Sequence, residues 1–98
     1  MSEREPGAGY GQTPEAAVEY RVEVVCRMLR LSPAKLRRYE AHGLVEPRRR
    51  GRARVYDESG LQRLRRVRRL TEDLGVNLAG VGIILRLVDE LAELRRRG

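Results

Sequence analysis

Apolar residues recur with helical spacing near the start of the chain's patterned region. The first set recurs at i, i+3, i+4 and i+7 and consists of Val22, Val25, Cys26 and Leu29. That spacing places all four residues on one face of a helix over about residues 23–30.

A second, shorter helix is predicted directly after the first. Ser32 is a suitable N-cap, Pro33 suits the first helical position, and Gly43 can adopt the left-handed conformation that closes a helix. Leu36 and Tyr39 fall on one side of this helix. Two short helices joined by so few residues must cross at a steep angle, which is typical of a helix-turn-helix.

The next segment carries the signals of a strand pair. Pro47 prevents the second helix from continuing, and residues 48–54 hold Gly51 in the middle of five arginines. Val55 and Tyr56 then restore strand-like chemistry. We therefore expect a two-stranded hairpin with a basic, projecting tip.

Two further helices complete the pattern. Asp57 is a plausible N-cap for a third helix that ends at Gly75, and Asn77 caps a fourth over about residues 78–96. The apolar series predicted for the third helix is Leu61, Leu64, Val67, Leu70 and Leu74. The fourth helix has a wider apolar stripe than a small core needs, which suggests a dimerisation surface. The candidate residues for that surface are Ile84, Leu87, Val88, Leu91 and Leu94.

These elements predict a mainly α fold with a small β-hairpin. Residues 1–17 are polar and interrupted by Gly and Pro, so we expect a flexible N-terminal tail. Residues 18–76 would form a winged helix-turn-helix domain with the third helix, and residues 77–98 a C-terminal amphipathic helix.

The distribution of charge along the chain indicates the kind of partner that it binds. The 98 residues carry a formal net charge of +7, and the segment from Arg27 to Arg69 holds fifteen basic residues against four acidic ones. Clustered arginines favour a polyanion, because phosphates accept charge-assisted hydrogen bonds and release counterions on binding. Double-stranded DNA is the first candidate. An anionic membrane is a poor one, since the chain has no Phe or Trp and turn residues break its basic segments.

Other classes of protein find little support in the composition. The single cysteine, Cys26, cannot form an intramolecular disulfide, and no apolar run resembles a signal peptide or a membrane span. We therefore expect a cytoplasmic, nucleoid-associated protein. No Cys/His pair at ligand spacing, glycine-rich phosphate loop or catalytic constellation is present, so we expect neither an enzyme nor a bound metal or cofactor.

Several motifs together resemble one family. The helix that reads Leu36-Arg37-Arg38-Tyr39-Glu40, the segment Gly43-Leu44-Val45-Glu46-Pro47, the Arg-rich turn and Arg54-Val55-Tyr56 are similar to the winged helix-turn-helix of MerR-type regulators. The segment Leu74-Gly75-Val76-Asn77-Leu78-Ala79-Gly80-Val81 is most similar to the HspR heat-shock repressor branch and to CbpM-type chaperone modulators. The resemblance implies a sequence-specific transcriptional regulator, and its HspR-like part implies a repressor of stress or chaperone genes.

The resemblance also assigns roles to residues. It implies that the second helix enters the major groove, with Ala34, Lys35 and Arg38 near base edges and Arg37 and Tyr39 near phosphates. In the wing it implies that Arg54 and Tyr56 contact the DNA backbone. The tip would add the charges of Arg48, Arg49, Arg50 and Arg52.

This chain departs from the family at several positions. Many relatives have Gly at Arg30, Thr at Lys35 and an aromatic residue at Arg38, so the operator sequence cannot be transferred. Relatives also continue into a longer dimerising helix and an effector domain, which we expect to be absent because the sequence ends at Gly98.

Two alternatives stay open. A CbpM-like modulator would use the same scaffold to bind a J-domain co-chaperone, and an architectural or excisionase-like protein would bind DNA with little sequence preference. We expect a homodimer that binds duplex DNA, with a chaperone or co-chaperone as a further partner.

Overall fold

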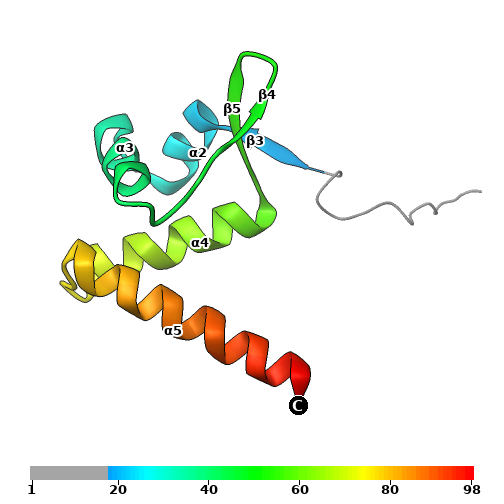
Figure 1. Cartoon of the computed structure of the whole chain (residues 1–98). Helices are drawn as coiled ribbons and strands as arrows, with labels where there is room; N and C mark the ends of the chain where they lie inside the picture. The colour runs from blue at the N-terminus through cyan, green and yellow to red at the C-terminus, as the bar shows by residue number, and fades with distance from the viewer. Residues whose placement is uncertain (1–17) are drawn as a thin grey trace, which may run out of the picture.

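A computed structural model describes residues 18–98, and the tail predicted for residues 1–17 lies outside them (Figure 1). The described chain follows the order β3, α2, α3, β4, β5, α4, η2 and α5. Four α-helices and a small sheet match the predicted fold class, a mainly α winged helix-turn-helix.

The sheet has three antiparallel strands, β3 (Glu19–Arg21), β4 (Arg48–Arg50) and β5 (Ala53–Asp57). Strand β5 lies between the other two, with Tyr20 opposite Tyr56 on one side and Arg49 opposite Arg54 on the other. The expected hairpin is therefore present, and β3 adds a third strand to it. Strand β3 pairs with the edge of β5 that an isolated hairpin would leave open.

Helices α2 (Val22–Leu29) and α3 (Pro33–Ala41) form the helix-turn-helix. The Ser32 hydroxyl accepts a hydrogen bond from the Lys35 N–H at 3.1 Å, and Gly43 has a φ of 70°, so both predicted ends of α3 are confirmed. Arg30 sits between the helices in the left-handed conformation, with a φ of 54°. This conformation lets the Leu31 N–H donate to the carbonyl of Cys26 at 2.9 Å and close α2.

Helix α4 (Glu58–Arg68) begins as predicted, because the Asp57 carboxylate accepts from the Gly60 N–H at 2.8 Å. The chain then widens into a π-helical turn, η2 (Arg69–Asp73), in which the Leu74 N–H donates to the Arg69 carbonyl. A π-turn adds a residue to the helical repeat and shifts the faces that follow it. Leu74 is consequently 64% exposed, so its predicted place on the apolar face of the third helix is wrong.

Helix α5 (Leu78–Arg97) starts at the predicted cap, where Asn77 Oδ1 accepts from the Gly80 N–H at 2.8 Å. Only Val81 and Leu85 of this helix are fully buried. In Figure 1, α5 leads from η2 away from the sheet, and its C-terminal half extends beyond the remaining elements. The first turns of α5 therefore complete the core while later turns face solvent.

The core lies where α2, α3, β5, α4 and the start of α5 meet. Its largest fully buried side chains are Tyr56, Leu36, Leu61, Leu64, Leu85, Val25, Val67 and Val81. No helix within residues 18–98 has the length and apolar character needed to cross a membrane.

The left-handed Arg30 makes a direct prediction about stability. A residue with a side chain loses roughly 1–2 kcal/mol of stability in this conformation, and glycine avoids that cost. Glycine also loses more chain entropy on folding, which lowers the gain by roughly 0.5–1 kcal/mol. Arg30→Gly should therefore raise the free energy of unfolding by about 0.5 kcal/mol, as measured by urea denaturation.

Arg27→Gly is the matched control, because Arg27 lies inside α2. Glycine in a helix interior should lower the free energy of unfolding by about 1 kcal/mol. Equal destabilisation by both glycine variants would contradict the strain assigned to Arg30.

Candidate nucleic-acid interface

Helix α3 divides into an inner face, an outer face and two flanks. Successive residues are separated by about 100° around a helix. Leu36 and Tyr39 are its only buried residues and point into the core. The opposite side presents the exposed residues Ala34, Arg37 and Arg38. This outer face is short, basic and free of large apolar side chains, so it suits a polyanionic partner.

One flank of α3 is joined to the hairpin through Glu40. Its carboxylate accepts a hydrogen bond from the Tyr56 hydroxyl at 2.8 Å and forms an ion pair with Arg54. The Glu40 side chain is only 15% exposed, so these contacts lie largely out of water. Burial, and next the hydrogen bond to Glu40, raise the pKa of Tyr56 far above its ordinary value. The phenol is therefore a neutral, fixed donor that ties β5 to α3.

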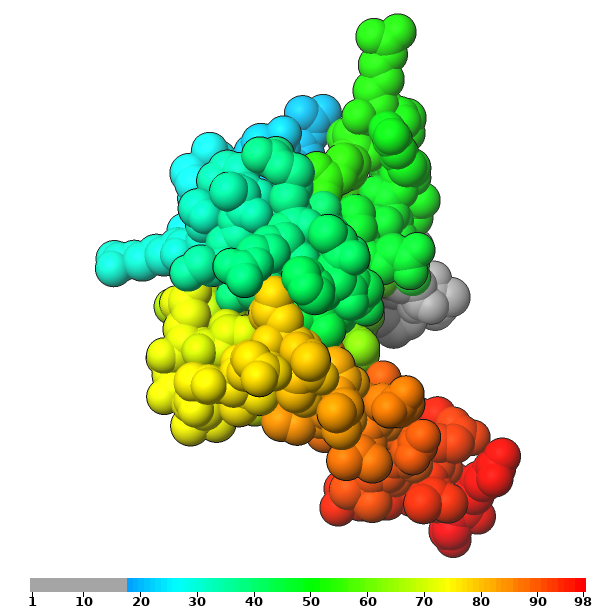
Figure 2. Space-filling view, turned by 60° about the vertical axis from the view of Figure 1, so that its left-hand side comes forward, coloured from blue at the N-terminus to red at the C-terminus, as the bar shows by residue number. Residues whose placement is uncertain are grey.

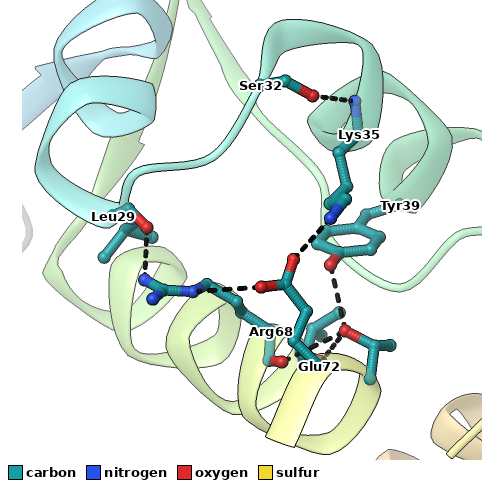
Figure 3. A network of polar contacts seen from close by, with 8 residues as sticks. Leu29, Ser32, Lys35, Tyr39, Arg68 and Glu72 are labelled. Atoms are coloured by element: carbon teal, nitrogen blue, oxygen red, sulfur yellow. Dashed lines mark hydrogen bonds and ion pairs between the residues drawn. The ribbon is translucent and has the colours of Figure 1, made fainter. Parts of the chain in front are cut away.

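The other flank is joined to η2 (Figure 3). Lys35 Nζ donates to the Glu72 carboxylate at 2.7 Å, and the hydroxyls of Tyr39 and Thr71 lie 3.0 Å apart. Thr71 Oγ1 also lies 3.0 Å from the Val67 carbonyl, to which it donates, so Tyr39 is the donor to Thr71. The hydrogen bond to Glu72 is the main cause that raises the pKa of Lys35.

Arg68 extends this network to the end of α2 (Figure 3). Its guanidinium donates to the Leu29 carbonyl and lies 3.8 Å from Glu72. Glu72 therefore lies between a cation of α3 and a cation of α4. Figure 2 shows the segment around residue 70 packed directly beneath α3, in agreement with these contacts.

Three arginines of the hairpin have internal partners. Besides the pair between Arg54 and Glu40, Arg48 lies 3.2 Å from Asp57 and Arg50 lies 2.7 Å from Glu19. The pKa of Asp57 is lowered, chiefly by the hydrogen bond from the Gly60 N–H. The carboxylates of Glu19, Glu40 and Asp57 offset part of the positive charge of the hairpin.

Two hairpin arginines remain without such a partner in the part of the chain that is described. Arg49 and Arg52 are exposed and lie within ion-pair distance of no described carboxylate. The hairpin projects from the body of the molecule in Figures 1 and 2. Arg49 and Arg52, together with Arg37 and Arg38, are the predicted site residues whose charge is available to a partner.

The remaining predicted site residues have different surroundings. Tyr39 and Tyr56 are 2% and 1% exposed, and both hydroxyls bond within the protein. Lys35 is exposed but paired with Glu72. Contact of any of these three with DNA would require an internal bond to be exchanged or shared.

The carboxylate partners were missed by reasoning from the sequence. They are Glu19, Glu40, Asp57 and Glu72. Acidic residues are rare between Arg27 and Arg69, and this rarity was a usable signal for Glu40 and Asp57. Among residues 18–98, no group of three or more His, Cys, Asp and Glu side chains could hold a metal ion.

The residues predicted for dimerisation lie on α5, apart from this interface. Leu87, Leu91 and Leu94 are 58%, 49% and 61% exposed, while Ile84 and Val88 are half-buried. Ile83, which the prediction omitted, is also exposed at 52%.

Comparison with known proteins places this geometry in a family. Residues 20–87 match the family model described as MerR HTH family regulatory protein. The chain belongs to the MerR family. It is also 40% identical, over 79 residues, to a Streptomyces coelicolor protein that carries the name heat shock protein HspR. The match covers 80% of this chain and 52% of that protein, so the chain spans about half the length of this relative.

The family confirms the resemblance drawn from the motifs of α3 and the hairpin. It is a family of regulatory proteins. Membership therefore supports a regulator rather than an enzyme.

The Glu40 contacts predict a stability difference. Glu40→Ala leaves the Arg54 guanidinium and the buried Tyr56 hydroxyl without their partner, so the free energy of unfolding should fall by about 2 kcal/mol. Urea denaturation measures this change. Glu93→Ala is the control, because Glu93 pairs with Arg96 and Arg97 on the exposed end of α5 and should cost less than about 0.5 kcal/mol. Similar losses in both variants would show that Glu40 does not anchor the hairpin.

Proposed function

We propose that the chain is a sequence-specific transcriptional regulator that binds duplex DNA as a dimer. Helix α3 enters the major groove, and the β4–β5 hairpin contacts the backbone beside it. The observation that carries this proposal is the outer face of α3, where Ala34, Arg37 and Arg38 are exposed next to a projecting basic hairpin. An α-helix fits the major groove, and a basic hairpin beside it suits the flanking phosphates.

Different side chains of the interface would contact the bases and the phosphates. Arg38 can donate two hydrogen bonds to a guanine edge, and the small Ala34 allows the helix to approach the bases. Arg37 would bind a phosphate, as Arg49 and Arg52 would from the hairpin tip. Lys35, which the family resemblance also assigns to base edges, reaches DNA only after it leaves Glu72.

The paired residues of the hairpin have a supporting part in this proposal. Arg54 and Tyr56 hold the hairpin against α3 through Glu40, and Arg48 and Arg50 add charge while bound to their own carboxylates. Tyr39 likewise fixes α3 from inside the core, where its hydroxyl bonds Thr71. The phosphate contacts implied for these residues would share oxygen or nitrogen atoms already engaged in the protein.

Dimerisation is proposed for α5. Leu87, Leu91 and Leu94 follow one another at spacings of four and three residues, which lines them along one stripe of the helix. Ile84 and Val88 border this stripe and are half-buried. A second copy would cover these apolar side chains and place two α3 helices on one palindromic site.

The likeness to HspR supports a role in the heat-shock response. We propose repression of stress or chaperone genes as the biological role. A CbpM-like modulator would not need an exposed Arg37 and Arg38 beside a basic hairpin, so DNA binding is the preferred activity.

Selection of bound sites from a random duplex pool tests this function. We expect a short motif repeated with two-fold symmetry, because a dimer presents two equivalent α3 helices. Recovery of sites without any shared motif would favour an architectural protein, and failure to retain DNA at low salt would exclude a regulator of this kind.

Substitutions then separate the roles of the arginines. Arg38→Ala should weaken binding to the selected site by about ten- to a hundred-fold, because a bidentate base contact is lost, and should change random-sequence binding much less. Arg52→Ala should weaken both by about five-fold through loss of one phosphate contact. Filter binding at several salt concentrations measures these effects. Arg86→Ala on α5 is the charge-matched control, and an equal loss in all three variants would contradict the proposal.

A further inference from the structure

Four cations of the candidate interface are held by carboxylates, and one of these pairs differs from the others. Arg48, Arg50 and Arg54 belong to the hairpin and pair with carboxylates of β5, β3 and α3. Lys35 is the one cation of α3 in an ion pair within residues 18–98, and its partner Glu72 lies 37 residues away on η2. The pair therefore joins the candidate recognition helix to an element outside the helix-turn-helix and hairpin.

The exposure of this pair argues against a role in stability. The side chains of Lys35 and Glu72 are 46% and 34% exposed, whereas Glu40, in the pair with Arg54, is only 15% exposed. Water screens an exposed ion pair, and holding two long side chains in one geometry costs entropy. The pair also borders an open cleft of about 270 Å³ between α3 and the start of α5. Glu72 therefore changes where the Lys35 charge lies far more than it changes the stability of the fold.

The position of Lys35 on α3 determines where Glu72 holds its charge. Lys35 lies on the flank of α3 between the outer face and η2, and Figure 3 shows its side chain extended towards Glu72. Arg37 and Arg38 sit on the outer face and pair with no described carboxylate. Of the basic side chains on α3, Lys35 alone is drawn away from the surface that would meet DNA.

We propose that Glu72 is an affinity-determining residue of the DNA interface. It holds Lys35 against η2 and withholds that positive charge from the phosphate backbone, an inference that rests on the proposed function. A lysine contact to phosphate is independent of sequence. By suppressing it, Glu72 weakens binding to random and to specific DNA by the same factor.

The test compares Glu72→Gln with Asp73→Asn on random-sequence duplex DNA. Both substitutions remove one negative charge from η2, but Asp73 makes no ion pair within residues 18–98. Glu72→Gln should tighten binding about five-fold at 0.15 M salt and steepen the logarithmic salt dependence by about 0.9, which is the contribution of one additional phosphate contact. Asp73→Asn should produce less than half of each change.

Glu72→Gln also frees Arg68, which lies near Glu72 and could itself tighten DNA binding. The same two substitutions are therefore repeated in a Lys35→Met background, where Lys35 can contribute no charge. In that background, Glu72→Gln should change the affinity for random-sequence DNA no more than Asp73→Asn does. A Glu72→Gln effect equal to that of Asp73→Asn in the otherwise unchanged chain, or one that persists without Lys35, would overturn the proposal while leaving the proposed function intact.

Two further measurements, DNA binding by the unaltered chain and urea denaturation of Glu72→Gln, separate the remaining outcomes. If the unaltered protein retains no DNA at low salt, the proposed function and the role of Glu72 both fail. Urea denaturation of Glu72→Gln should change the unfolding equilibrium less than about five-fold, as expected for an exposed pair. A larger change would make Glu72 a structural anchor and would contradict the assigned role.

Discussion

The orientation of α3 depends on polar contacts at both of its flanks. The helix has nine residues and buries only Leu36 and Tyr39, so apolar packing alone fixes it weakly. Glu40 joins one flank to the hairpin, and Tyr39 with Lys35 joins the other to η2. Held from two sides, the helix can present a basic outer face without being pulled into the core or released into solvent.

The same carboxylates decide which positive charges a partner meets. The chain has a formal net charge of +7, and most of its arginines lie between Arg27 and Arg69. These cations would repel one another strongly if none of them were paired. Internal pairing relieves this repulsion at Lys35, Arg48, Arg50 and Arg54. Charge remains available on the outer face of α3 and at the hairpin tip, which is where we propose that a polyanion binds.

Local features were predictable from the sequence, and features that depend on distant residues were not. The caps at Ser32, Asp57 and Asn77 involve residues three positions apart, so the sequence alone indicated them. The pairing of β3 with β5 and the contact between Lys35 and Glu72 arise from segments that meet only in the folded chain. Helical periodicity predicted an apolar role for Leu74 because it assumes a constant repeat, which η2 interrupts.

We propose that α3 and the hairpin tip, held in one orientation, form the surface that binds DNA. Nitrogen-15 NMR of the arginine side chains during titration with duplex DNA tests it most directly, because each Nε–H reports its own contacts. The signals of Arg37, Arg38 and Arg52 should shift, while that of Arg63, which donates to the Leu44 carbonyl at 2.7 Å, should stay unchanged. Shifts confined to the exposed Arg65, Arg66 and Arg69, with α3 unaffected, would contradict this account.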